Sequence, residues 1–316
     1  MREGSERGQR SRKAVGLLAL LSLAAMSPDA AGQELEPRAY SPSPTGASFL
    51  VVGYGRSTGG VVFDPSLPFS DVRAEVNAAS LVYGRTFGLA GRLASVDLVL
   101  PYVWGSVSGE VAEEQQEVHR SGGADARFRL TLNLVGAPAL SPREFATRKP
   151  STILGASLMV AAPTGQYDPA KLINLGANRW AFRPQLGLSH PVGRWNLELY
   201  GGVWLFTDNE DFFGGSQRRQ QAIGAFQTHV SYTVRRRLWA AVNATFYTGG
   251  RTTVDGVAKA DLQRNSRVGA TLSLPIGQRH SLKLAATTGM TTRIGGDFDS
   301  LAIAWQYVWL QRRDGK

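Results

Sequence analysis

Single charged side chains recur inside segments of this chain that otherwise alternate between polar and apolar residues. In FRLTLNL, Arg129 lies between Phe128 and Leu130, and in SLKLAATT, Lys283 lies between Leu282 and Leu284. A charge that repeats with the period of a β-strand lies on one face of a sheet, opposite the apolar face. We therefore expect an enclosed polar surface whose charges pair with one another or line a path for solutes. The expected lining residues are Arg127, Arg129, Arg183, Glu198, Arg267 and Lys283.

One acid–base pair within this set is predicted from the positions of its members. Arg183 and Glu198 lie on either side of the short turn at 190–194, at nearly symmetric positions. Residues at matching distances from a hairpin turn face each other across the two strands. We therefore expect a cross-strand ion pair between them.

Catalytic chemistry has one weak signal, the H-x-S spacing of His229 and Ser231. The same spacing is found in outer-membrane phospholipases, which also need an Asn that orients the His and a position facing lipid. Here the neighbours Phe226 and Val230 lie on the opposite, apolar face, so the pair is expected to point inward. No His or Cys cluster has the spacing of metal ligands, and the chain has no Cys. We expect no catalytic site, metal or cofactor.

A group of aromatic side chains lies near the expected outer ends of several strands. Such residues either form an aromatic girdle at the membrane interface or offer an apolar surface where hydrophobic solutes enter a barrel. Both interpretations stay open from the sequence. The residues are Trp204, Phe206, Phe212, Phe213 and Tyr247.

The elements that must position these side chains are strands, because a period of two runs through nearly the whole chain. About twelve segments show it, and most have about ten residues or more, which suits strands that cross a membrane at a tilt. In the last of them, LAIAWQYVW, the alternate residues Leu301, Ile303, Trp305, Tyr307 and Trp309 are large and apolar, as expected for a face turned to lipid. The segments lie near 47–54, 72–86, 93–107, 124–135, 151–162, 179–189, 194–207, 221–234, 238–248, 265–274, 281–289 and 299–310.

Short and long connections alternate along these segments. FGLAGR (87–92) and HPVGR (190–194) are short, whereas the connections around 108–121 and 249–264 are long and polar. Short periplasmic turns with longer outer loops are typical of bacterial outer-membrane barrels, and GAPALSPREFATRKP (136–150) would be a longer periplasmic connection. The sequence thus predicts an all-β fold, a transmembrane antiparallel up-and-down β-barrel of about 12 strands. A soluble β-sandwich is the alternative, but it would need a polar exterior.

The N-terminal region predicts export. A basic start, the apolar stretch AVGLLALLSLAAM and small residues at Ala30 and Gly32 have the form of a cleaved signal peptide. The expected division is a signal peptide over 1–32 and an outer-membrane barrel over 33–316. The formal charge of +10 is spread along the chain, which favours an anionic membrane surface over nucleic acid as the partner.

Several segments together resemble one protein family. They include RTFGLAGR (85–92), RFRLTLNLVGAPALSP (127–142), APTGQYDPAKLINLGANRW (162–180) and YTGGRTTVDG (247–256). In this combination the chain resembles the family called "Putative MetA-pathway of phenol degradation", bacterial outer-membrane proteins commonly described as transporters. The resemblance implies a single barrel and the passage of aromatic or other hydrophobic molecules, and it supplies no functional residues. The last strand also resembles the signal read by the barrel assembly machinery.

The sequence leaves two main functions open. The first is a channel or transporter that passes small, hydrophobic or aromatic molecules through a polar-lined barrel in the bacterial outer membrane. The second is a non-conducting structural or surface-binding barrel, stabilised by its internal charges. A lipid-modifying enzyme is a remote third. The expected partners are outer-membrane lipid, the assembly machinery and small solutes.

Overall fold

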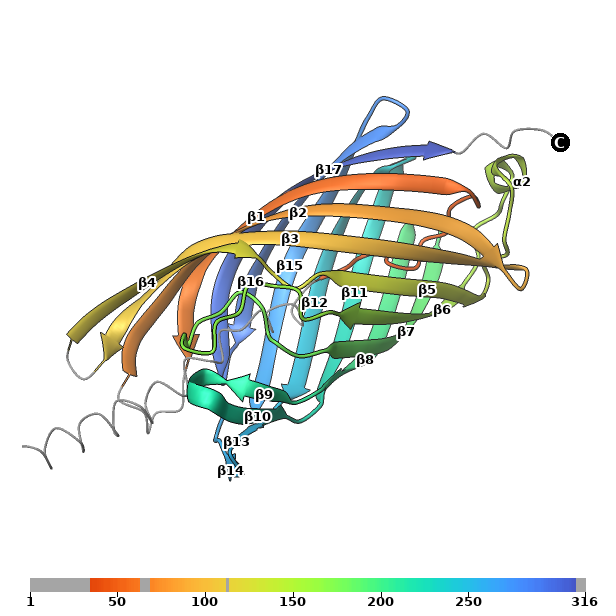
Figure 1. Ribbon diagram of the computed structural model, residues 1–316. Helices are drawn as coiled ribbons and strands as arrows, with labels where there is room; N and C mark the ends of the chain where they lie inside the picture. The colour runs from red at the N-terminus through yellow and green to blue at the C-terminus, as the bar shows by residue number, and fades with distance from the viewer. Residues whose placement is uncertain (1–34, 63–68, 112–113, 311–316) are drawn as a thin grey trace, which may run out of the picture.

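Twelve long antiparallel strands form the body of the computed structural model, which describes residues 35–62, 69–111 and 114–310 (Figure 1). The predicted signal peptide lies outside these residues. Strands were predicted because the inner and outer faces meet different solvents, and each of the twelve predicted segments is found. Their bounds are β1 Ala47–Val62, β2 Phe69–Leu89, β3 Arg92–Val111, β5 Arg127–Val135, β6 Ile153–Ala161, β7 Ala181–Val192, β8 Trp195–Phe206, β11 Ile223–Arg235, β12 Leu238–Gly249, β15 Gln263–Ile276, β16 His280–Thr291 and β17 Gly295–Leu310.

The sheet closes on itself, because its first and last strands pair along their whole length. β1 and β17 are antiparallel partners from Ala47 opposite Leu310 to Val62 opposite Gly295. Each remaining strand of the ring pairs with its two neighbours in the order of the chain. Closure satisfies the backbone donors and acceptors that hydrocarbon would otherwise leave unpaired. The predicted transmembrane up-and-down barrel of twelve strands is confirmed.

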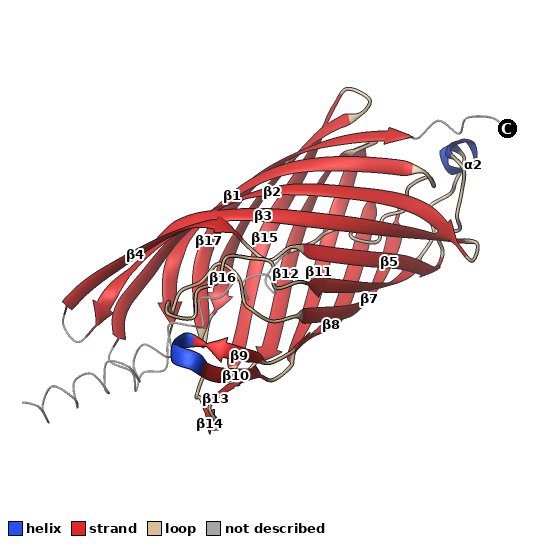
Figure 2. Ribbon diagram, in the orientation of Figure 1, coloured by secondary structure: helices blue, strands red, loops and turns tan. Residues whose placement is uncertain are grey.

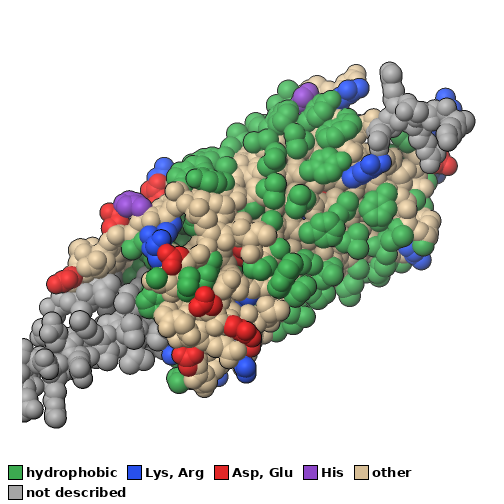
Figure 3. Space-filling view, viewed as in Figure 1, with side chains coloured by type: hydrophobic (Ala, Val, Ile, Leu, Met, Phe, Trp, Pro, Cys, Tyr) green, Lys and Arg blue, Asp and Glu red, His purple; other side chains and the backbone are tan. Residues whose placement is uncertain are grey.

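A belt of large apolar side chains covers the outside of the barrel (Figure 3). Leu301, Val242 and Leu199 keep 68%, 67% and 61% of their surface exposed, which water would not favour. In β17 the rings of Trp305, Tyr307 and Trp309 stack in sequence along the same outer face. This belt is the lipid-facing surface that the alternation predicts.

The two ends of the barrel differ. The end nearest the C-terminus has tight turns, including the one between β7 and β8, and also carries the short helix α2 Pro142–Ala146 (Figure 1). Helix α2 was not predicted from the sequence, although Ser141 and Glu144 form a capping box and a proline occupies the first turn. Among the described residues, no helix is both long and apolar enough to cross a membrane.

The opposite end carries more strand than predicted, as the strand colouring of Figure 2 shows. The segment 108–121, expected to be a loop, is a hairpin in which β4 Glu114–Gly123 pairs with the outer half of β3. The loops 208–220 and 249–264 contribute β9 Asn209–Phe212, β10 Ser216–Gln220, β13 Thr252–Val254 and β14 Val257–Ala258 to a separate four-stranded sheet. These strands lie beyond the apolar belt. Their sequences are polar and lack the alternation of apolar residues from which strands were predicted.

Candidate functional site in the barrel lumen

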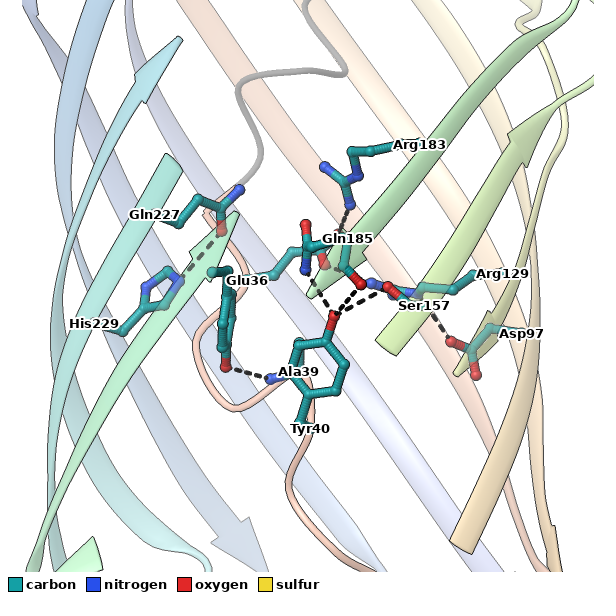
Figure 4. Close-up of polar contacts among 11 residues, drawn as sticks. Glu36, Ala39, Tyr40, Asp97, Arg129, Ser157, Arg183, Gln185, Gln227 and His229 are labelled. Carbon is teal, nitrogen blue, oxygen red and sulfur yellow. Dashed lines mark hydrogen bonds and ion pairs between the residues drawn. The ribbon is translucent and has the colours of Figure 1, made fainter. Parts of the chain in front are cut away.

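The segment 35–46, which precedes β1, lies inside the barrel (Figure 4). Its charged residues contact several strands that are far away in the sequence. The Glu36 carboxylate bridges two guanidinium groups: it forms a short ion pair with Arg129 and lies 3.5 Å from Nη2 of Arg183. Nε of Arg129 also donates to Oδ2 of Asp97 at 3.2 Å. A partly buried acid thus joins β5 and β7 from within the lumen.

The predicted ion pair between Arg183 and Glu198 is wrong. In the register of β7 and β8, Glu198 lies opposite Ser189, several residues nearer the turn than Arg183. The turn lies between Val192 and Trp195, closer to Glu198 than the turn over 190–194 that the sequence predicted. Arg183 therefore pairs with Glu36, and both Arg183 and Glu198 are 1% exposed.

Arg38 satisfies Glu198 and extends the network to β11. The backbone N–H of Arg38 donates to Oε2 of Glu198 at 2.9 Å. Its guanidinium donates to the hydroxyls of Ser231 at 3.1 Å and Thr233 at 2.6 Å. The same guanidinium lies over the ring of Trp239, 4.6 Å from its centroid, in a cation–π contact.

Tyr40 fills a slot between β6 and β7. Its hydroxyl lies 3.1 Å from Oγ of Ser157 and accepts from Nε2 of Gln185 at 3.2 Å. A Cβ atom on Gly155 or Gly187 would lie 2.1 or 2.0 Å from the Tyr40 ring, so only glycine permits this approach. The slot shows that the wall is shaped to hold the N-terminal segment.

The His229–Ser231 pair lies in the same packed region, and neither residue has any exposed surface. Nδ1 of His229 lies 2.8 Å from Oδ1 of Asn243, so the His does have an Asn neighbour. Its Nε2, however, lies 3.2 Å from Oε1 of Gln227, while the Ser231 hydroxyl accepts from Arg38. Ser231 and His229 therefore do not form a nucleophile–base pair in this geometry.

The six predicted lining residues all lie on the inner face, but their environments differ. Arg183, Glu198 and Arg267 are buried, and Nη2 of Arg267 donates to the backbone oxygen of Phe298 at 2.5 Å. Arg127 and Arg129 are partly buried on β5, whereas Lys283 on β16 keeps an exposed side chain. The structure brings Arg129 and Arg183 together through Glu36, and leaves Arg267 and Lys283 on the other side of the lumen.

The predicted outer aromatic residues form two groups. Trp204 and Tyr247 are buried inside the barrel in one apolar cluster, against which Phe206 packs. Phe212 belongs to a second cluster with Val254 in the outer sheet, and Phe213 packs against that cluster. Arg179 and Arg218 lie over the rings of Phe206 and Phe212 respectively. The five residues therefore do not make one continuous surface.

Opposite the N-terminal segment, the inner wall carries small side chains. The register places Ala285, Ala302, Gly55 and Ala78 side by side across β16, β17, β1 and β2. The next row contains Ala304, Gly53 and Ser80 beside Lys283. All of these residues keep accessible surface, whereas the wall around His229 has almost none. Open space in the lumen therefore lies along this small-residue wall, defined as Gly53, Gly55, Ala78, Ser80, Ala285, Ala302 and Ala304.

Glu36, Arg38 and Tyr40, which bind the inner wall, were not among the residues predicted from the sequence. A signal did exist, because ELEPRAY (34–40) carries charges between the predicted cleavage position and the first strand. Inward charges on the strands also needed partners that the strands alone did not supply. Among the described residues, no cluster of three or more His, Asp or Glu side chains could hold a metal ion.

Comparisons with known proteins agree with the barrel fold. The family model described as "Putative MetA-pathway of phenol degradation" matches residues 44–297. No curated protein matches the chain. Among solved structures, the COG4313 outer membrane channel from Pseudomonas putida F1 superposes with a TM-score of 0.73 at 24% identity, covering 87% of this chain and 100% of that one. The β domain of the Bordetella autotransporter BrkA gives 0.49 at 11% identity, covering 84% and 100%.

Proposed function

The chain belongs to the family "Putative MetA-pathway of phenol degradation", and from this membership and the lumen geometry we propose that it is an outer-membrane channel. Small hydrophobic or aromatic molecules would pass through its barrel. Lipid surrounds the apolar belt, and the aromatic strand β17 is the segment that the assembly machinery would recognise. The predicted signal peptide over 1–32 would direct its export.

The observation that carries the proposal is the small-residue wall. The N-terminal segment fills the side of the lumen lined by β5 to β8 and β11, where residues are buried and hydrogen-bonded. On the other side, Ala302 remains exposed although it points inward. A passage along this wall would be lined mostly by small apolar side chains, which suits a small hydrophobic or aromatic solute better than a hydrated sugar.

Of the aromatic residues at the outer end, Trp204 and Tyr247 are buried, so an entering solute would instead meet the partly buried Phe206 and Phe213. Flat aromatic side chains offer stacking surfaces to flat solutes. The charged residues Arg129 and Arg183 would hold the N-terminal segment in place, rather than contact the solute themselves.

The test compares a substitution that narrows the passage with a matched substitution on the outer face of the same strand. Ala302→Phe places a ring beside Gly55, whereas Leu301→Phe changes the adjacent, lipid-facing residue, which is 68% exposed. Each variant is produced in a porin-deficient Gram-negative strain, and uptake of radiolabelled aromatic solutes is measured. We expect Ala302→Phe to reduce uptake severalfold and Leu301→Phe to leave it unchanged. No uptake above the empty strain for any solute would reject the channel.

A non-conducting barrel is the second candidate, favoured by the firm attachment of the N-terminal segment. Its residues Glu36, Arg38 and Tyr40 all bind buried partners. Single-channel recordings in planar bilayers distinguish the two. Discrete conductance steps of the wild type support the channel, and their absence together with the absence of uptake supports the structural barrel.

A further inference from the structure

Lys283 is an enclosed cation that has kept an accessible surface. It lies on the inner face of β16, opposite Ser273 on β15 and Ala304 on β17. The closed ring of strands encloses it, yet the residue remains exposed. Both statements hold together if the ammonium group borders an internal space that small molecules can reach. The small neighbours Ala304, Gly53 and Ser80 account for that space.

Other cations on the inner face have partners, and Lys283 differs from them. Arg129 and Arg183 bind Glu36, and Arg267 donates to Phe298 and the hydroxyls near it. For Lys283 the described part of the chain provides neither a hydrogen bond nor an ion pair. Glu36 acts on it through space only, and the oxygens of that carboxylate already bind the two arginines.

The contact that Lys283 does make is with an aromatic ring. Its Nζ lies 5.9 Å from the centroid of Trp239, at the outer limit of a cation–π contact. Trp239 is buried, and Arg38 covers its ring at 4.6 Å. The small-residue wall lies beside this pair, so a flat ligand has both an open wall and a positive group within reach.

An ammonium group enclosed by protein without a counter-ion is destabilised, and an anion that reaches it relieves that cost. We propose that Lys283 is a ligand-binding residue of the passage and that it selects aromatic monoanions, such as aromatic carboxylates, over their neutral analogues. This inference rests on the proposed channel and names its substrate class. The carboxylate would accept a hydrogen bond from Nζ, and the ring would lie along Ala302 and Ala304.

The experiment measures binding separately from conduction. Benzoate and the neutral benzyl alcohol are titrated into the full-length processed protein in detergent, with binding followed by calorimetry. The variants are Lys283→Met, Lys283→Arg and, as a matched control, Lys149→Met. Lys149 is exposed in the connection between β5 and β6, away from the lumen. The heat-modifiable gel shift of folded barrels verifies that each variant has folded.

We expect the wild type to bind benzoate on the order of tenfold more tightly than benzyl alcohol, as one charge-assisted hydrogen bond provides. Lys283→Met should abolish this preference, while Lys283→Arg and Lys149→Met should retain it. Equal binding of the two probes by the wild type, or a preference that survives in Lys283→Met, overturns the inference. In parallel bilayer recordings, missing conductance with intact benzoate preference would reject the channel and keep the binding site. Conductance without the benzoate preference would keep the channel and reject the binding site.

Discussion

Replacing Glu36 with Gln removes the one negative charge that joins Arg129 and Arg183. The Arg183 side chain is 2% exposed and the Glu36 side chain 16%, so solvent screens this ion pair little. Removing one partner of a buried pair costs roughly 3–5 kcal/mol because the other charge stays desolvated. An amide still accepts a hydrogen bond, and the N-terminal segment can leave the lumen and admit water. We therefore expect a loss of about 3 kcal/mol, at the lower end of that range.

An exposed ion pair in the same barrel supplies the control. Arg56 on β1 and Glu75 on β2 lie 3.0 Å apart, with side chains 54% and 46% exposed. Such a pair contributes roughly 0–1 kcal/mol in water, so Glu75→Gln should have little effect. Both variants are unfolded reversibly with urea in phospholipid vesicles, and tryptophan fluorescence gives the free energy of unfolding at constant m-value.

A second readout follows from the position of Glu36. If the weakened segment leaves the lumen, the single-channel conductance of Glu36→Gln should exceed that of Glu75→Gln. The reasoning fails if both variants lose the same stability, within about 1 kcal/mol. It would then follow that Glu36 is hydrated, and that the segment does not lie against β5 and β7.

Three further predictions test the slot, the belt and the helix cap. Gly187→Ala would place a Cβ atom 2.0 Å from the Tyr40 ring, so Tyr40 should be displaced and become accessible to nitration. In the control Gly201→Ala, the nearest atom to the added Cβ is 3.7 Å away, so Tyr40 should stay protected from nitration. Val242→Arg puts a charge into the lipid-facing belt and should cost about 2–4 kcal/mol in urea unfolding. Val257→Arg, in the outer strand β14, should cost almost nothing, and equal losses would contradict the assigned belt. Hydrogen bonds from Ser141 hold the pKa of Glu144 below its ordinary value of 4.5. The ionised carboxylate therefore stabilises the capping box fully above pH 4.5, and this stabilisation is lost as the pH falls through the lowered pKa. The protection factor of the Ser141 amide, which corrects for the intrinsic pH dependence of exchange, should therefore fall in acid. A protection factor unaffected by the Glu144→Ala substitution would argue against the cap.

The barrel was predictable because its wall separates two solvents. Lipid and lumen impose opposite preferences on alternate residues, so a strand such as WNLELYGGVWLF, which became β8, carries its orientation in its own sequence. Strand ends were less predictable. β3 continues past the membrane into the hairpin with β4, where neither face meets lipid and the alternation fades.

The local sequence predicted which charged side chains point inward, but it did not predict which of them form ion pairs. Arg183 and Glu198 looked symmetric about a turn, but the register of β7 and β8 separates them, and each binds the N-terminal segment instead. Glu36 and Arg129 are far apart in the chain and become neighbours only when the sheet closes around the segment. The orientation of a side chain depends on its own strand, so the sequence alone decides it. The partner of a buried charge depends on what the closed barrel encloses, and this only the tertiary structure decides.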